Sequence, residues 1–502
     1  MRIRLAAAVA AALMGQGVAF GTASLVELAK SGDTAAALQL IEQKADVNAA
    51  EKDGTTALHW AVYRNDVELV DRLIKAGADV NAVNEYGSSP LSEAAVTGNV
   101  EVIRKLLEAG ADPESPNADG QTALMLLART SNVEAAKLLI RHKANVNAVE
   151  NWKGQTALMW AAAQSQPEMV KLLVKHGAEV NARSKVNNWQ RQVTAEPRAQ
   201  ARPAGGLTPL LYAARQGCLE CAKALVEAGA DVDMTDPEGV TPLIMAIQNF
   251  HFDTARYLLE SGANPNKWDW WGRTPLYSAV DLNTIPHGGR PDRISLDETT
   301  SLQLIEMLLK AGANPNAQLK LFPPYRALGP DRGADQMLTM GATPLLRAAK
   351  AGDVPAVKLL LAYGANPNLP NIYGHTPVMA AANLGSNEID TRGRFKTQEQ
   401  AVETIELLVK AGADVNARDT RLGQTALHGA ALWGWNDVIK ALVAHNADLT
   451  AKDKKGMTPL DSALGRAGGH GRGGTRIEVH EATAALIREL TASTAPPEKQ
   501  QL

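Results

Sequence analysis

The sequence predicts an all-α solenoid made of stacked helix-turn-helix units, and three observations lead to this fold class. The chain has 502 residues, of which 45% are apolar but only 4% are aromatic, so its core must come mainly from Ala, Leu and Val. One short motif recurs with a base period of 33 residues. Within each period, Pro and Gly stand where helices start and end.

The recurring motif has Thr or Ser first, Pro or Ala second and a Leu-like residue third. Proline is tolerated in the first helical turn, where its missing N–H has no intrahelical partner, and Thr can cap the exposed amides. The motif therefore marks the start of a first helix, and a Gly-Ala-Asp/Asn-x-Asn-like block about 21 residues later leaves room for a second. The first residues of the eleven copies are Thr56, Ser89, Thr122, Thr156, Thr208, Thr241, Thr274, Thr343, Thr376, Thr425 and Thr458.

The 33-residue period and the Thr-Pro-Leu-His-x-Ala-like motif resemble the ankyrin-repeat family from about residue 24 to residue 490. The resemblance implies an ankyrin-repeat solenoid with projecting β-hairpin or loop fingers between its helix pairs. It also implies a concave surface, lined by fingers and first helices, that binds protein partners. His59 and His428 occupy the histidine position of the motif, which in this family forms hydrogen bonds between repeats.

Irregular intervals between the motifs place four insertions between residues 183 and 400. Two of them fall in fingers, and we expect these two to act as lips around one binding groove. The predicted segments are a signal peptide (1–23), an N-terminal capping repeat (24–50), regular repeats (51–183), a finger insertion (184–206), repeats (207–281), an interhelix insertion (282–298), a second helix (299–317), a finger insertion (318–340), repeats (341–384), an interhelix insertion (385–399), repeats with a C-terminal cap (400–490) and a disordered tail (491–502).

The first 23 residues have the pattern of a secretory signal. Arg2 and Arg4 precede a short apolar run, and small residues lead to Ala23, the preferred cleavage point. We therefore expect export to the bacterial periplasm or an equivalent compartment. No membrane span is expected after signal removal. The net charge of −3 lacks the basic excess of a dedicated nucleic-acid binder, so no nucleic-acid partner is expected.

Candidate partner contacts follow from the family resemblance, position by position. They lie at finger tips and at the ends of first helices, and exposed aromatics and arginine dominate interface energetics. The densest aromatic cluster, around Trp270, is the strongest candidate. The predicted contacts are Trp268, Trp270, Trp271, Arg273, Ile372 and Tyr373 in fingers, Arg215, Gln248, Asn249 and Asp281 on first helices, and Trp189 and Tyr325 in the finger insertions; Tyr63, Tyr86, Trp152 and Trp433 occupy similar positions.

Two alternatives to a protein-binding scaffold remain open. Cys218 and Cys221 form a C-x-x-C motif at the start of a second helix, which suits either a local disulfide or redox activity. The first finger insertion is basic, with Arg183, Lys185 and Arg191, and could bind an anionic polymer. No H-E-x-x-H, G-x-S-x-G or P-loop motif occurs, so we expect no enzyme activity, cofactor or metal.

Overall fold

The computed structural model describes residues 23–187, 204–284, 295–321, 337–385, 396–466 and 479–494. The chain divides into two compact units, residues 1–179 and 180–502. Most of the predicted signal peptide, the middle of each insertion, a Gly-rich segment (467–478) and residues 495–502 lie outside the described residues. Each unit is described by itself below.

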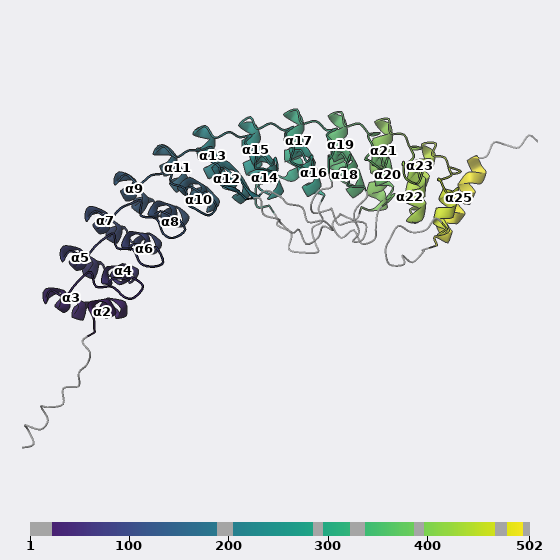
Figure 1. Cartoon of the computed structure of the whole chain (residues 1–502). Coiled ribbons are helices and arrows are strands. Elements are labelled where there is room, and N and C mark those ends of the chain that lie inside the picture. The colour runs from purple at the N-terminus through teal and green to yellow at the C-terminus, as the bar shows by residue number, and fades with distance from the viewer. Residues whose placement is uncertain are drawn as a thin grey trace, which may run out of the picture. The chain divides into compact units, whose positions relative to one another are not determined.

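The first unit consists of helix pairs arranged in two layers (Figure 1). Each first helix packs against its own second helix and against the first helix of the next pair, and second helices also pack against one another. The first helices are α2 (Leu25–Ser31), α4 (Ala57–Tyr63), α6 (Pro90–Thr97), α8 (Ala123–Thr130) and α10 (Ala157–Ala163); the second helices are α3 (Thr34–Glu42), α5 (Val67–Lys75), α7 (Val100–Glu108), α9 (Val133–Arg141) and α11 (Pro167–Lys175).

The second unit repeats the same two-layer arrangement (Figure 1). Its first helices are α12 (Pro209–Gln216), α14 (Pro242–Gln248), α16 (Pro275–Asn283), α18 (Pro344–Ala351), α20 (Pro377–Ala381), α22 (Ala426–Leu432) and α24 (Pro459–Ala463); its second helices are α13 (Leu219–Glu227), α15 (Phe252–Glu260), α17 (Ser301–Lys310), α19 (Val354–Ala362), α21 (Gln398–Lys410), α23 (Asn436–Ala444) and α25 (Glu481–Thr494). A short antiparallel ladder joins β1 (Val186–Asn187) to β2 (Ala204–Gly205), with Val186 opposite Gly205. The predicted all-α solenoid is confirmed.

The helix boundaries follow from the motif. At α12, the hydroxyl of Thr208 accepts a hydrogen bond from the backbone N–H of Leu211 at 3.2 Å, and proline occupies the first helical turn. The helix ends at Gly217, whose φ is 71°, a left-handed conformation that favours glycine. A Cβ at Gly217 would also lie 2.2 Å from the His251 ring, so a larger residue would disrupt packing onto the next repeat.

A ladder of asparagines ties neighbouring repeats together along each unit. The Asn81 side chain donates a hydrogen bond to the carbonyl of Gly110 at 3.1 Å and accepts one from the N–H of Asp112 at 2.8 Å. Asn147 and Asn316 do the same for their following repeats. The ladder satisfies turn amides and carbonyls and so sets the spacing of the stack.

Several boundaries differ from the sequence prediction by a few residues. Helix α16 extends to Asn283 and α21 begins at Gln398, so both reach into predicted insertions. Helix α25 continues to Thr494, whereas a disordered tail was expected from residue 491. The Thr491 hydroxyl donates to the carbonyl of Ile487 at 2.7 Å within this last turn. The small residues of this turn carry no helix-breaking signal, so the helix does not end where its apolar pattern does.

Candidate functional site

One finger of the second unit, residues 268–273, has a rigid internal framework. The carboxylate of Asp269 is almost fully buried and accepts hydrogen bonds from the N–H groups of Trp271 at 3.1 Å and Arg273 at 2.9 Å. The guanidinium of Arg273 donates to the same carboxylate at 2.6 Å. The N–H of Trp270 donates to the carbonyl of Glu238 in the preceding finger at 2.7 Å. This finger is therefore fixed both internally and to its neighbour.

Two tryptophan side chains project from this framework into solvent. Trp268 is 54% exposed and Trp270 is 64% exposed. The ammonium group of Lys320, from the next finger, lies 3.6 Å from the centre of the Trp268 ring. An ammonium held over an indole face is favourable, and it places a cation beside the exposed aromatic surface. Exposed indoles on a fixed turn are a costly feature that the fold itself does not use.

The expectation that Trp271 and Arg273 face a partner is wrong, because both side chains are buried. Trp271 is only 4% exposed, and its carbonyl accepts hydrogen bonds from the N–H groups of Lys320 and Leu321, so the next finger packs over it. The guanidinium of Arg273 lies 4.7 Å from the centre of the Trp271 ring and pairs with Asp269. These two residues support the finger and do not form its contact surface.

Asp281, a predicted contact on a first helix, is also buried, at 2% exposed. Its carboxylate accepts a hydrogen bond at 2.5 Å from the guanidinium of Arg347, which is 1% exposed. The pair links α16 to α18 at the positions that would face a partner on a regular first helix. The physical reason is charge pairing: a buried carboxylate needs a buried cation, and Arg347 supplies it. The sequence prediction for Asp281 is therefore corrected.

The other first-helix candidates lie partly exposed on α12 and α14. Arg215 lies over the ring of Tyr212 at 4.9 Å. The side chain of Asn249 donates to the carbonyl of Met245 at 2.8 Å, so it closes its own helix end. Gln248 is half-buried beside it. None of these contacts reaches the finger with the exposed tryptophans among the interactions printed for described residues, so the structure does not bring the two groups into direct contact.

Ile372 and Tyr373 form the tip of a later finger. Ile372 is 51% exposed, and Tyr373 is half-exposed. Backbone hydrogen bonds run from Ile372 to Met340 at 2.9 Å and from Thr420 to Tyr373 at 2.9 Å, so neighbouring finger tips are laced together. Trp189 and Tyr325 lie outside the described residues, as does most of the predicted pair of lips.

The first unit also exposes aromatic and aliphatic side chains that the sequence analysis did not rank highly. Tyr63 and Val96 end successive first helices and lie 33 residues apart, and both are more than half exposed. Tyr86 and Trp152 are exposed at finger tips. The sequence prediction missed Val96, although its spacing from Tyr63 could have revealed it. The first unit thus offers apolar surface of its own.

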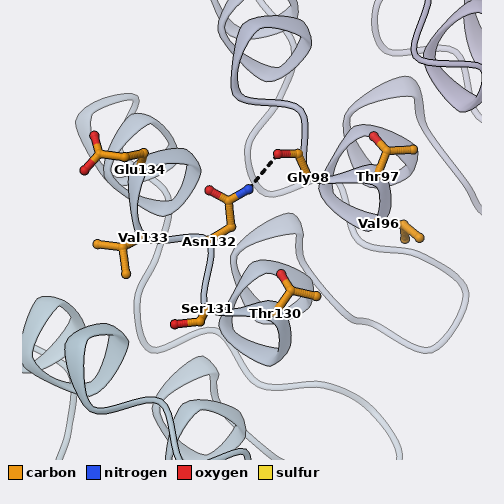
Figure 2. A pocket seen from close by; sticks show the side chains of 8 residues that line it. All are labelled: Val96, Thr97, Gly98, Thr130, Ser131, Asn132, Val133 and Glu134. Atoms are coloured by element: carbon orange, nitrogen blue, oxygen red, sulfur yellow. Dashed lines mark hydrogen bonds between the residues drawn. The ribbon is translucent and has the colours of Figure 1, made fainter.

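A pocket of about 520 Å³ lies beside Val96, at the turns that follow α6 and α8 (Figure 2). The Asn132 side chain crosses it, donating to the carbonyl of Gly98 at 2.6 Å and accepting from the N–H of Ala135 at 3.1 Å. The carboxylate of Glu134 pairs with Lys137. These polar groups are already used within the fold, so the pocket suits an apolar side chain better than a polar ligand. It is lined by Val96, Thr97, Gly98, Thr130, Ser131, Asn132, Val133 and Glu134.

Cys218 and Cys221 are joined by a disulfide at the start of α13. Cys218 is the N-cap residue and is 9% exposed, whereas Cys221 has no exposed surface. The bridge therefore packs against the helix pair, with only one sulfur near solvent.

The motif histidines have structural roles, as expected. His59 Nδ1 accepts a hydrogen bond from the N–H of Thr56, and Nε2 lies 3.0 Å from the carbonyl of Ser88 in the next repeat. His428 makes the equivalent contacts with Thr425 and Met457. Burial lowers the pKa of both imidazoles, which keeps them neutral. Neutral Nε2–H groups can therefore donate between repeats.

Within the described segments, no group of three or more His, Cys, Asp or Glu side chains could hold a metal ion. A search of the same residues for a helix long and apolar enough to cross a membrane finds none.

Comparison with known proteins gives partial matches to larger proteins and to repeat domains. One segment of 180 residues is 27% identical to a transient receptor potential cation channel subfamily A member 1 homolog of Caenorhabditis elegans and covers 32% of this chain. Another, of 91 residues, is 35% identical to neurogenic locus notch homolog protein 1 of Mus musculus and covers 18% of this chain. The matches span only 13% and 4% of those two relatives.

Among solved structures, the human ASB11 ankyrin repeat domain is 25% identical, with a TM-score of 0.40, and the match covers 48% of this chain and 98% of that one. The ankyrin repeat domain of Bcl-3 is also 25% identical, with a TM-score of 0.39, and the match covers 51% of this chain and 99% of that one. The family profile described as "Ankyrin repeats (3 copies)" matches residues 25–117, 105–184, 191–269, 210–319, 300–390 and 396–470. These matches cover most of the repeat region, and the chain belongs to the ankyrin-repeat family.

Proposed function

We propose that this protein is a scaffold that binds a protein partner through the finger at residues 268–273. Ankyrin-repeat proteins are generally non-enzymatic interaction scaffolds, and their repeats imply protein partners. The single observation that supports this site is the exposure of Trp268 and Trp270 on a turn whose remaining side chains are buried. Tryptophan is the residue type most enriched among residues that dominate interface energies.

The framework below the two tryptophans favours tight binding. Asp269, Arg273 and Trp271 fix the backbone of the finger before any partner arrives. A fixed turn loses little conformational entropy on association, so more of the contact energy appears as affinity. Lys320 beside Trp268 adds a cation, which suits a partner surface that combines apolar and acidic groups.

A crosslinking experiment tests the proposed site. A photoreactive amino acid in place of Trp270 in the full chain should capture one partner, identified by mass spectrometry. The matched control carries the same amino acid in place of Lys310, an exposed position on the second-helix layer. Equal capture from both positions, or none from Trp270, would contradict a binding site on this finger.

An affinity measurement with the purified partner then tests the energetics. We expect Trp268→Ala/Trp270→Ala to weaken binding by about 30-fold or more, which corresponds to about 2 kcal/mol. Tyr363→Ala removes an exposed aromatic at the end of α19 and should leave affinity unchanged. A loss confined to variants that replace Cys218 and Cys221 would favour redox activity instead.

We further propose that the protein works in an exported compartment such as the bacterial periplasm. The support is the sequence pattern of residues 1–23 and a disulfide, which persists best in an oxidising environment. Cell fractionation followed by N-terminal sequencing of the purified protein tests this. Cytosolic recovery with residues 1–23 intact would contradict it.

A further inference from the structure

Two adjacent fingers near the end of the second unit carry a concentration of positive charge. The N–H of Lys454 donates to the carbonyl of Leu422 at 2.8 Å, and its ammonium donates to the carbonyl of Thr420 at 2.6 Å. The Arg418 guanidinium reaches the carbonyl of Lys452 at 2.5 Å. These contacts hold the two tips side by side. We call the cationic side chains of these fingers the basic ridge: Arg418, Arg421, Lys452, Lys454 and Lys455.

The acidic residues of the same fingers do not cancel this charge at the surface. Asp419 is buried, and its carboxylate accepts hydrogen bonds from three backbone N–H groups at 2.6 to 2.8 Å. Asp453 is buried likewise and accepts from the N–H groups of Lys455 and Met457. Both carboxylates are thus directed into the turns. In the part of the chain that the structure describes, no ion pair involves Lys452, Lys454 or Lys455.

The cations are not a requirement of the fold. Equivalent tip positions, just before the turn glycine, hold very different residues in other fingers: Glu85 and Tyr86, Ala118 and Asp119, and Pro237 and Glu238. All of these turns form with the same backbone hydrogen bonds, between the residue that opens the turn and the glycine that ends it. The choice of lysine at both tip positions of the last finger is therefore free to serve recognition.

The basic ridge continues into apolar surface at the preceding finger. The N–H of Thr420 donates to the carbonyl of Tyr373 at 2.9 Å, and the guanidinium of Arg421 lies 5.9 Å from the centre of the Tyr373 ring. Ile372 is exposed at the same tip. A surface that places cations beside aromatic and aliphatic side chains matches an acidic polypeptide with interspersed apolar residues better than a uniformly charged polymer.

We propose that the basic ridge is a second interaction surface, which binds an acidic, apolar-flanked segment of a partner protein. It lies on different fingers from Trp268 and Trp270. This inference rests on the proposed scaffold function only in assuming a protein partner. Charge complementarity at such a surface contributes mainly to specificity and association rate, so binding weakens as salt rises.

The test uses the full chain and a fluorescein-labelled peptide of Glu-Leu-Glu-Glu repeats, with affinity measured by fluorescence anisotropy. We expect Lys454→Glu/Lys455→Glu to weaken binding by about 10-fold, Lys454→Gln/Lys455→Gln by less, and about 0.5 M NaCl to weaken it by at least about 10-fold. The matched control, Lys410→Glu/Lys440→Glu, makes the same change in net charge on exposed second-helix positions and should have no effect. Thermal unfolding curves establish that each variant is folded.

Three outcomes would overturn the proposal. These are equal losses in the matched control, no peptide binding by the unaltered chain, and tighter binding of a single-stranded oligonucleotide or heparin than of the peptide. The Trp268→Ala/Trp270→Ala variant should bind the peptide normally. Failure of the basic ridge is therefore distinguishable from failure of the finger at residues 268–273.

Discussion

The buried pair between Asp281 and Arg347 gives the sharpest test of the structure. We predict that Asp281→Asn, which keeps the side-chain shape but removes the charge, will lower the free energy of unfolding by about 3 to 5 kcal/mol. The reason is that the Arg347 guanidinium remains 1% exposed without its carboxylate. With charge centres about 4 Å apart and an effective dielectric constant of about 20, the lost attraction alone is roughly 4 kcal/mol.

A matched surface pair provides the control. Asp437 and Lys440 lie 3.6 Å apart on α23, and both side chains are more than half exposed. Solvent screens such a pair, so Asp437→Asn should cost at most about 0.5 kcal/mol. The double variant Asp281→Asn/Arg347→Met should recover most of the loss, because it leaves no buried charge without a partner.

Urea unfolding followed by tryptophan fluorescence measures these differences, and amide hydrogen exchange locates them. Repeats interact mainly with their neighbours, so lost protection should concentrate in α16 and α18. If Asp281→Asn costs no more than Asp437→Asn, Asp281 is solvent-accessible in the folded protein. The sequence-based assignment of Asp281 as a partner contact would then regain its basis.

Three further predictions concern the repeats themselves. Asn81→Ala should cost about 1 kcal/mol of unfolding free energy through its lost hydrogen bonds to the next repeat, while Asn81→Asp, which keeps the acceptor, should cost less by urea titration. The lowered pKa of His59 means that the unfolded chain binds the proton first, so thermal stability should be complete above about pH 6.5 and fall as the pH drops through the folded-state pKa; His59→Gln should flatten that profile. Reduction of the Cys218–Cys221 disulfide closes a loop of only four residues and should cost about 2 kcal/mol, seen as a lower unfolding midpoint with a phosphine reductant and absent in the double Ala variant.

The repeat architecture could be predicted from local sequence because every copy carries its own signals. Thr208 caps a helix, a proline follows it, and Gly217 ends the helix in a left-handed conformation, each within a few residues of the next. Contacts between repeats then follow from the 33-residue period, as the histidine of the first motif shows by reaching the next repeat. Only element ends, such as that of α25, departed from the pattern.

The candidate site was less predictable, since exposure depends on what packs over a residue. Trp270 and Trp271 are adjacent in sequence, yet one projects into solvent and the other lies beneath the next finger. Asp281 is buried because Arg347, 66 residues later, supplies its counter-charge. No local signal distinguishes these cases.

The sequence by itself determined the family, the helix boundaries and the positions available for recognition, because these depend on short-range capping, turn chemistry and a regular period. The tertiary structure decided which of those positions are open. It buried Trp271, Arg273 and Asp281, left Trp268 and Trp270 exposed, and turned the carboxylates of the last fingers inward so that lysine dominates their surface. The physical reason is that burial and net surface charge arise from neighbours brought together by stacking.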